Sequence, residues 1–223
     1  RTQIVQGVTQ SSVEAVFEDP ESEQAYQEAK NISQKYTHFL LENSEALKSI
    51  MEIKNTDQDL SHHGVTVASL AVKLANELGY TDKKQLELLA LGASLHDFGL
   101  IYTTIDWKKT EANMTPEEIK EYKKHPSLGA DMLKDKKHLD QSVLTIIMEH
   151  EERSNGKGFP QGLLEAKIDK MALIVGLCDY FDKLIFIEGL TKEEASKKLS
   201  FDAIGKYPLD MVNGLKQLLK NTV

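Results

Sequence analysis

The sequence is poor in the residues that mark several protein classes. It contains one cysteine, five prolines and thirteen glycines in 223 residues. The single cysteine, Cys178, excludes an internal disulfide framework and fits a reducing compartment, so we expect a cytoplasmic protein. The scarcity of proline and glycine argues against a turn-rich all-β fold. The chain also lacks a long uncharged apolar run and a signal-peptide pattern, so we expect no membrane span.

Positive charge is scarce as well. Asp and Glu number 35 against 27 Lys and Arg, which gives a formal net charge of −8. This balance argues against duplex nucleic acid as a partner, because backbone binding needs clustered cations. It remains compatible with a small anionic substrate, because a metal ion can reverse the local field. The chain begins at Arg1 rather than Met, which leaves room for an upstream regulatory domain.

Amphipathic helical patterns fill most of the chain, and alternating strand patterns are weak, so we predict an all-α fold. Thr115-Pro116-Glu117-Glu118 is a strong helix start, with a capping hydroxyl, Pro at the first position and acids at the positive dipole end. Residues 1–20 are mixed, and residues 100–114 are predicted to form a loop. Another helix is expected after Asn43-Ser44. The remaining predicted helices cover about residues 22–42, 59–78, 81–98, 126–135, 139–150, 167–187, 191–200 and 207–220.

Polar residues extend the apolar stripes of five predicted helices. Continuing each stripe by three or four residues reaches an imidazole or a carboxylate, often near a helix end. The residues reached are His63, His96, Asp97, His125, His150 and Asp179. Any one histidine is more simply a hydrogen-bonded core residue. Burying even a neutral polar group unpaired costs about 2–7 kcal/mol, however, so the set as a whole favours a shared partner. Imidazoles and carboxylates are the ligands of Zn, Fe and Mn sites.

At this point the sequence resembles a known family. Adjacent His96 and Asp97 in "LGASLHDFG" are similar to the signature of the HD superfamily of metal-dependent phosphohydrolases. The wider pattern resembles the HD-GYP branch, whose members hydrolyse cyclic di-GMP. The other matching segments are "HGVTVASLAVKLANELGY", "HPSLGADML", "HEERSNGKGFP" and "LIVGLCDYFDKL". The resemblance covers about residues 35–220. It implies an HD-type helical bundle with a metal site in its centre, which we assign to residues 41–223.

The resemblance implies a ligand set for two metal ions. Its members are His63, His96, Asp97, His125, His150 and Asp179, with Asp97 bridging the ions. Glu151 stands where the family has a second His and could bind through oxygen. Asp59 fits either a further carboxylate ligand, as in a trinuclear subgroup, or a helix N-cap. Cys178 is expected in the core, facing away from the ligands.

Several positions depart from the family pattern. Leu100 replaces a lysine that contacts the substrate phosphate, and Phe159 replaces a tyrosine. "EGLT", Glu188 to Thr191, stands where the family has an Arg-Pro-x-Arg run. Losing one charge-assisted contact typically costs about 1.5–3 kcal/mol, or about ten- to a hundredfold in binding. The candidate substrate contacts are Leu100, Lys157, Gly158 and Phe159. Trp107, Lys108 and Lys109 either supply substitute stacking and charge or form a solvated loop with one packed aromatic.

The implied chemistry is hydrolysis of a phosphodiester by two divalent ions, with Fe or Mn favoured and Zn compatible. The ions would share Asp97 and a water whose pKa falls toward neutrality, so His96 and Asp97 are the candidate catalytic residues. One hypothesis is a phosphodiesterase acting on cyclic di-GMP or a related nucleotide. The others are a binding module that keeps the metal site without turnover, and an HD-type phosphohydrolase acting on another phosphoester. Residues 1–40 are predicted to form a helical packing or homodimerisation element.

Overall fold

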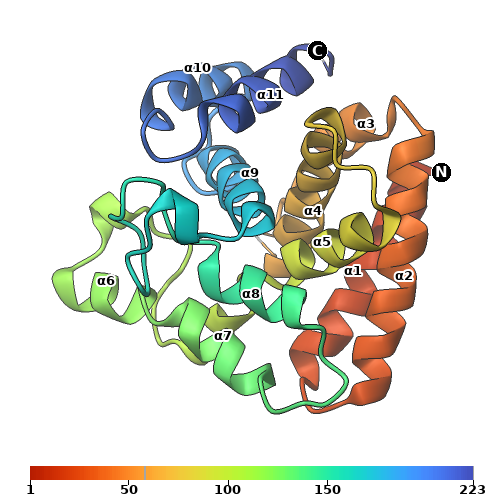
Figure 1. Ribbon diagram of the computed structural model, residues 1–223, viewed down its shortest axis with the longest axis horizontal. Helices are drawn as coiled ribbons and strands as arrows, with labels where there is room; N and C mark the ends of the chain where they lie inside the picture. The colour runs from red at the N-terminus through yellow and green to blue at the C-terminus, as the bar shows by residue number, and fades with distance from the viewer. Residues whose placement is uncertain (58, 223) are drawn as a thin grey trace.

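The computed structural model describes residues 1–57 and 59–222 and is all-α, as predicted (Figure 1). The α-helices are α1 (Thr2–Glu18), α2 (Glu23–Glu42), α3 (Ala46–Glu52), α4 (Leu60–Glu77), α5 (Lys83–Leu95), α6 (Pro116–Tyr122), α7 (His125–Leu133), α8 (Gln141–Glu149), α9 (Lys170–Phe186), α10 (Lys192–Asp202) and α11 (Leu209–Lys220). Short 3₁₀ helices are η1 (Phe98–Tyr102), η2 (Glu111–Asn113) and η3 (Glu165–Lys167). Across these described residues the only β-type pairing consists of two isolated bridges.

Most of the described α-helices begin directly after a residue whose side chain caps the first turn. The Thr115 hydroxyl accepts from the backbone N–H of Glu118, whose side chain accepts in return from Thr115, so the predicted start of α6 is confirmed. Two boundaries differ from prediction. Residues 1–20 had a mixed pattern with no helix bounds predicted within the helical segment expected at 1–40, and residues 2–18 form α1. The helix predicted to reach about Phe98 ends at Leu95, because the chain tightens there into 3₁₀-type bonds from His96 to Ala93 and from Leu100 to Asp97.

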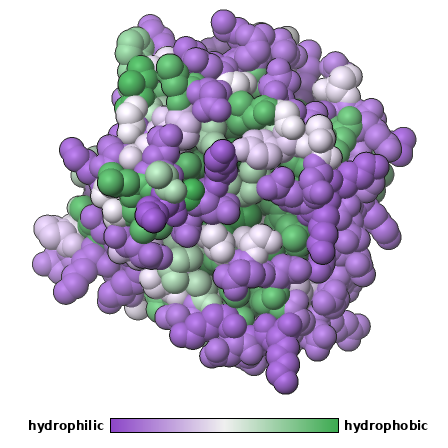
Figure 2. Space-filling model, viewed as in Figure 1, coloured by the Kyte–Doolittle hydropathy of each residue, from purple (hydrophilic) through white to green (hydrophobic). Residues whose placement is uncertain are grey.

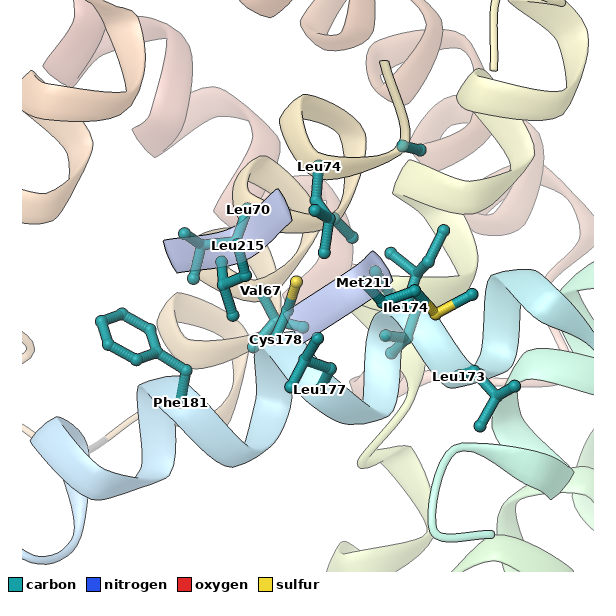
Figure 3. Packing of buried hydrophobic residues seen from close by; sticks show 14 of the residues in the cluster. Val67, Leu70, Leu74, Leu173, Ile174, Leu177, Cys178, Phe181, Met211 and Leu215 are labelled. Atoms are coloured by element: carbon teal, nitrogen blue, oxygen red, sulfur yellow. The ribbon is translucent and has the colours of Figure 1, made fainter. Parts of the chain in front are cut away.

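The core is built around α4, α5 and α9. Val67, Leu70 and Leu74 of α4 face α9 and α11, and Cys178 is buried in this cluster as expected (Figure 3). A second cluster joins α1 and α2 to α4, α5 and α8, with Tyr26 among its fully buried members. Residues 1–40 therefore pack into the same body as the rest of the chain. Their role in dimerisation stays a prediction.

The surface agrees with the acidic, polar composition. Hydrophilic side chains cover most of the face seen in Figure 2, with apolar ones visible between them. Within residues 1–57 and 59–222, none of the helices combines the length and the apolar character that a bilayer crossing requires.

Candidate metal centre and its pocket

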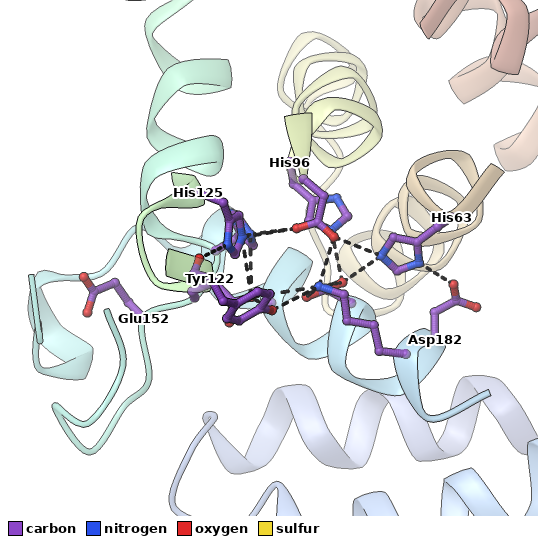
Figure 4. A network of polar contacts seen from close by, with 12 residues as sticks. His63, His96, Tyr122, His125, Glu152 and Asp182 are labelled. Atoms are coloured by element: carbon purple, nitrogen blue, oxygen red, sulfur yellow. Dashed lines mark hydrogen bonds and ion pairs between the residues drawn. The ribbon is translucent and has the colours of Figure 1, made fainter. Parts of the chain in front are cut away.

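The six side chains reached by the apolar stripes meet in the middle of the molecule, together with Glu151 (Figure 4). His63 comes from α4, His125 begins α7 and Asp179 lies on α9. The others follow helix ends: His96 and His150 are the C-caps of α5 and α8, and Asp97 and Glu151 come next. All seven are at most 4% exposed. Helix ends are suited to this because side chains there can leave the stripe and converge on one point.

The ligand atoms form two groups that share one carboxylate. One group contains His63, His96, Asp97 and Asp179; the other contains Asp97, His125, His150 and Glu151. Within each group the atoms lie within 4.8 Å of one another. Asp97 belongs to both, which is the position expected of a bridging carboxylate.

Distances in the first group are short. Asp179 Oδ1 lies 2.8 Å from His63 Nε2 and 3.0 Å from His96 Nε2. Asp97 Oδ2 lies 3.5 Å and 3.3 Å from the same two nitrogens. Donor atoms that sit about 2.1 Å from one ion at right angles lie about 3.0 Å apart, so these separations match the edges of a coordination shell.

The second group has similar spacing. The Nε2 atoms of His125 and His150 are 3.0 Å apart, and each is 3.3 Å from Asp97 Oδ1. Glu151 Oε1 is 3.7 Å and 3.9 Å from these nitrogens. Neither oxygen of buried Asp97 has a hydrogen-bond donor in good alignment. Lys183 Nζ forms an ion pair with Oδ2 at 2.9 Å, but Oδ1 faces only the two imidazoles, and a cation between the groups would be a partner for both oxygens.

The histidine tautomers favour the same conclusion. Nδ1 of His96, His125 and His150 donates to the carbonyl three residues earlier, at 2.6, 2.7 and 2.8 Å. His63 Nδ1 donates to Asp182 Oδ2 at 2.6 Å. When such a ring is neutral, Nδ1 carries its proton and the Nε2 lone pair faces the centre, where it can bind a metal. Two facing lone pairs 3.0 Å apart repel unless a cation lies beside them. The donor set therefore fits divalent metal ions.

The carboxylates remain ionised. Burial raises the pKa of Asp97, but His96 and Lys183 outweigh burial and hold it well below its usual value. Burial likewise raises the pKa of Asp179, and Lys183 is the strongest of the neighbours that bring it well below the ordinary range. Lys183 comes from α9, and its Nζ lies 2.9 Å from Asp97 Oδ2. Ionised carboxylates are the form that binds a metal.

The imidazoles differ from one another. Burial lowers the pKa of His150, which favours the neutral ring that a metal requires. Burial acts in the same direction on His63, but hydrogen bonding to carboxylates, Asp179 first, raises its pKa well above the usual value. For His96, burial is outweighed by Asp97 and Asp179, which raise the pKa to about 9. In the metal-free chain these two rings hold protons that a metal would displace.

Asp59 is the one nominated ligand that lies outside both groups. Its Oδ1 accepts from the backbone N–H of Ser61 at 2.8 Å, as the N-cap of α4. Its Oδ2 accepts from Gln10 of α1 at 3.1 Å. Of the two alternatives for Asp59, the structure has the N-cap.

Sequence reasoning missed four polar residues around the centre. Asp182 orients His63, and Lys183 contacts Asp97 and Asp179. The Tyr122 hydroxyl donates to Glu151 Oε1 at 2.8 Å. Arg153 donates to the other oxygen of Glu151 at 2.9 Å. Asp182 and Lys183 lie three and four residues after Asp179 on α9, so extending that stripe one turn further would have found them.

The turn after His150 is shaped by its own backbone. A Cβ on Gly158 would lie 2.4 Å from Arg153 N and 2.5 Å from Glu151 O, so only glycine fits there. Glu152 is 1% exposed and accepts from the backbone N–H groups of Gln161 and Leu163 at 2.7 and 2.8 Å. This packing holds Phe159 edge-on to the ring of Tyr122, with centroids 6.0 Å apart.

A pocket of about 860 Å³ opens over the two groups. Asp97, Glu151 and Asp179 contribute to its wall. All four candidate substrate contacts also line it: Leu100, Lys157, Gly158 and Phe159. Seven cations line the wall despite the negative net charge, against five carboxylates. The cations are Lys109, Lys123, Arg153, Lys157, Lys183, Lys198 and Lys206, and the carboxylates are Asp97, Glu111, Glu151, Asp179 and Glu188.

The loop predicted at residues 100–114 contributes to this pocket. Trp107 and Lys109 line it, and Trp107 stacks on Phe186 with ring centroids 5.9 Å apart. Lys108 does not line it; its Nζ lies 5.6 Å from the Trp107 ring centroid. The pocket position of Trp107 and Lys109 fits the first alternative for this loop, and the packing of Trp107 on Phe186 fits the second, so both stay predictions.

Comparison with known proteins agrees with these features. Residues 46–207 match the family model described as HD domain. The structure of Bd1817, a HDG"Y"P protein from Bdellovibrio bacteriovorus, superposes with a TM-score of 0.93 at 44% identity, covering 99% of this chain and 72% of that one. The chain belongs to the HD-GYP branch of the HD superfamily. The resemblance stated from the sequence is therefore confirmed.

Curated HD-GYP relatives are similar over part of their length. A cyclic di-GMP phosphodiesterase of Pseudomonas aeruginosa is 27% identical over 172 residues, which cover 69% of this chain and 41% of that protein. The cyclic di-GMP phosphodiesterase PdeB of Borreliella burgdorferi is 27% identical over 169 residues, covering 67% of this chain and 44% of that protein. The chain thus spans less than half the length of these relatives.

Proposed function

We propose that this HD-GYP chain is a metal-dependent phosphodiesterase that hydrolyses cyclic di-GMP or a related cyclic dinucleotide. The observation that carries the proposal is the pair of ligand groups sharing Asp97 at the wall of a cationic pocket. Paired metal sites that share ligands are typical of phosphoester hydrolysis. The relatives named cyclic di-GMP phosphodiesterases support this substrate class.

Each side chain would have a distinct part in the reaction. His63, His96 and Asp179 would hold one ion, and His125, His150 and Glu151 the other, with Asp97 common to both. Bound there, two divalent ions supply Lewis acidity and lower the pKa of a water toward neutrality. Asp182 keeps the proton of His63 on Nδ1, so its Nε2 stays available. Oxygen-rich ligation with imidazoles favours Fe or Mn, with Zn compatible.

The pocket suits a dinucleotide in size and charge. Its volume of about 860 Å³ lies in the upper part of the range for small-molecule sites. The cations of its wall would meet the two phosphates of a cyclic dinucleotide. Trp107 and Phe159 bring aromatic rings to the same wall, and bases could stack on such rings.

A binding module with weak or no turnover is the second candidate, and the departures at the pocket wall favour it. Leu100 brings no charge to a position that is 2% exposed, and Phe159 brings no hydroxyl. Glu188 carries a negative charge into the wall, where Lys198 pairs with it at 2.8 Å. These changes remove recognition contacts and leave the ligand groups intact. Another phosphoester substrate would fit the same observations.

The deciding experiment combines metal analysis with turnover. The protein is purified anaerobically, loaded with Fe(II) or Mn(II), analysed for bound metal and incubated with cyclic di-GMP. We expect close to two ions per chain and formation of a linear dinucleotide. Metal bound with cyclic di-GMP binding but no product would establish the binding module instead. Metal bound with neither binding nor turnover would eliminate the cyclic di-GMP assignment.

A further inference from the structure

Lys183 stands at the junction of the two ligand groups. Its Nζ lies 2.9 Å from Asp97 Oδ2, 3.1 Å from Asp179 Oδ1 and 3.9 Å from Glu151 Oε1. It therefore contacts the shared carboxylate and one carboxylate from each group. Arg153, by comparison, reaches only Glu151 among these ligands. Lys183 keeps 18% of its side chain exposed and lines the pocket.

The charges explain why a lysine is stable at this place in the metal-free chain. Asp97, Asp179 and Glu151 bring three negative charges into a buried volume. Ionised carboxylates so close together repel strongly unless cations lie among them. Lys183 and Arg153 supply two of the positive charges that offset them, and of these two only Lys183 reaches all three carboxylates. Lys183 therefore neutralises part of the carboxylate charge that metal ions would otherwise neutralise.

Metal loading changes that balance. Two divalent ions add four positive charges to the three carboxylates, so the carboxylates no longer need the ammonium group. The ammonium would then share its surroundings with cations. Lysine carries its charge on a flexible four-carbon stem, so Nζ can turn away while the helix stays in place. The direction open to it is the pocket, whose wall it already forms.

We propose that Lys183 is a cation with two positions: it neutralises the carboxylates of the metal-free centre, and it contacts a phosphate of the bound ligand once the ions are present. This inference rests on the proposed function. It assigns the phosphate contact of the pocket floor to α9, on the helix that also provides Asp179. Leu100, which lines the same pocket, provides no charge for that contact.

The proposal predicts effects of opposite sign on two ligands. Lys183→Met removes a cation that competes with metal, so Mn(II) should bind severalfold more tightly to the metal-free protein. The same change removes a charge-assisted contact, so inorganic phosphate should bind the Mn-loaded protein about ten- to a hundredfold more weakly. A residue that only supports the fold would weaken both. Titration calorimetry measures both affinities without relying on turnover.

Two further variants make the test specific. Lys183→Arg keeps the charge and should retain most of the phosphate affinity. Lys170→Met removes an exposed lysine of the same helix outside the pocket and should change neither affinity. Lys183→Met with wild-type phosphate affinity, or with weaker Mn(II) binding, would overturn the proposal. A wild-type protein that binds no Mn(II) or Fe(II) would overturn the proposed function itself, and this inference with it.

Discussion

At the scale of single residues, Asp97 occupies the position that most requires a nearby cation. It is 2% exposed, belongs to both ligand groups and has no aligned hydrogen-bond donor. Most buried carboxylates accept several aligned hydrogen bonds, whereas Asp97 has only the ion pair with Lys183 at 2.9 Å to offset the cost of burying its charge. Asp97 is therefore suited to binding cations and poorly suited to any role in the apolar core.

We expect Asp97→Asn to remove most of the bound metal, because a neutral amide cannot bridge two divalent ions. Asp59→Asn is the matched control. Asn is as good an N-cap as Asp, so that variant should keep the fold, and Asp59 lies outside both groups, so it should keep the metal. Elemental analysis of both purified variants checks the prediction. Metal lost equally from both would instead make Asp59 a ligand.

The residues found from sequence alone share one property. His63, His125 and Asp179 each extend an apolar stripe, so their helices had to direct them inward. Asp182 and Lys183 were missed because a charged residue late in a helix is normally solvated. They lie one turn beyond Asp179 on the same stripe, and the packing of α9 against α4 brings them to the centre.

At the scale of elements, the ends of helices carry most of the site. α5 stops at Leu95, and the tighter turns that follow bring His96 and Asp97 to the centre together. A continuous helix to Phe98 would have separated these neighbours by about 100° around its axis. The sequence pattern predicted this helix and its inward-facing stripe, but it did not predict that the helix ends at Leu95. Residues 1–40 were expected to be helical, but the bounds of α1 were not predicted, because its buried face includes Gln6, Thr9 and Ser12 in place of an apolar stripe.

The turn after α8 depends on one buried carboxylate. Glu152→Ala leaves the N–H groups of Gln161 and Leu163 without their acceptor, so we expect a loss of about 1–3 kcal/mol in the free energy of unfolding. Hydrogen exchange should quicken across residues 151–163. Metal content should persist, because Glu152 belongs to neither group. Chemical denaturation, hydrogen exchange and elemental analysis measure the three effects.

Glu165→Ala is the control for this variant, because Glu165 lies exposed in the adjoining η3. It should leave stability and exchange unchanged. If Glu152→Ala lost metal while its turn stayed protected, Glu152 would belong to the metal centre and the structural explanation would be wrong.

At the scale of the whole molecule, the centre joins α4, α5, α7, α8 and α9. Ligands that bind only the folded state stabilise it by mass action, by about 2.7 kcal/mol at a hundredfold excess over Kd. We therefore expect Mn(II) to raise the Tm of the wild-type protein and to leave that of Asp97→Asn almost unchanged.

The size of that rise should depend on pH. In the metal-free chain the pKa of His63 is well above 6.5 and that of His96 is about 9. Both protonated rings therefore stabilise the fold fully at a pH below the pKa of an unfolded-state histidine. That contribution is lost as pH rises toward 9, while competition between protons and metal disappears. The Tm difference between metal-loaded and metal-free protein should thus widen from pH 6 to pH 9. A difference that narrows over this range would contradict the assignment of these histidines.

The position of the pocket over the candidate metal centre has a consequence for the order in which metal ions and a nucleotide would bind. All seven candidate ligand residues are at most 4% exposed, and three of them, Asp97, Glu151 and Asp179, form part of the pocket wall. An ion that reaches the centre along this route passes through the space that a nucleotide would later fill. Ions would therefore have to be loaded first and the nucleotide second, and a bound nucleotide would slow the exchange of ions with solvent. The metal ions would therefore stay bound for as long as a nucleotide fills the pocket.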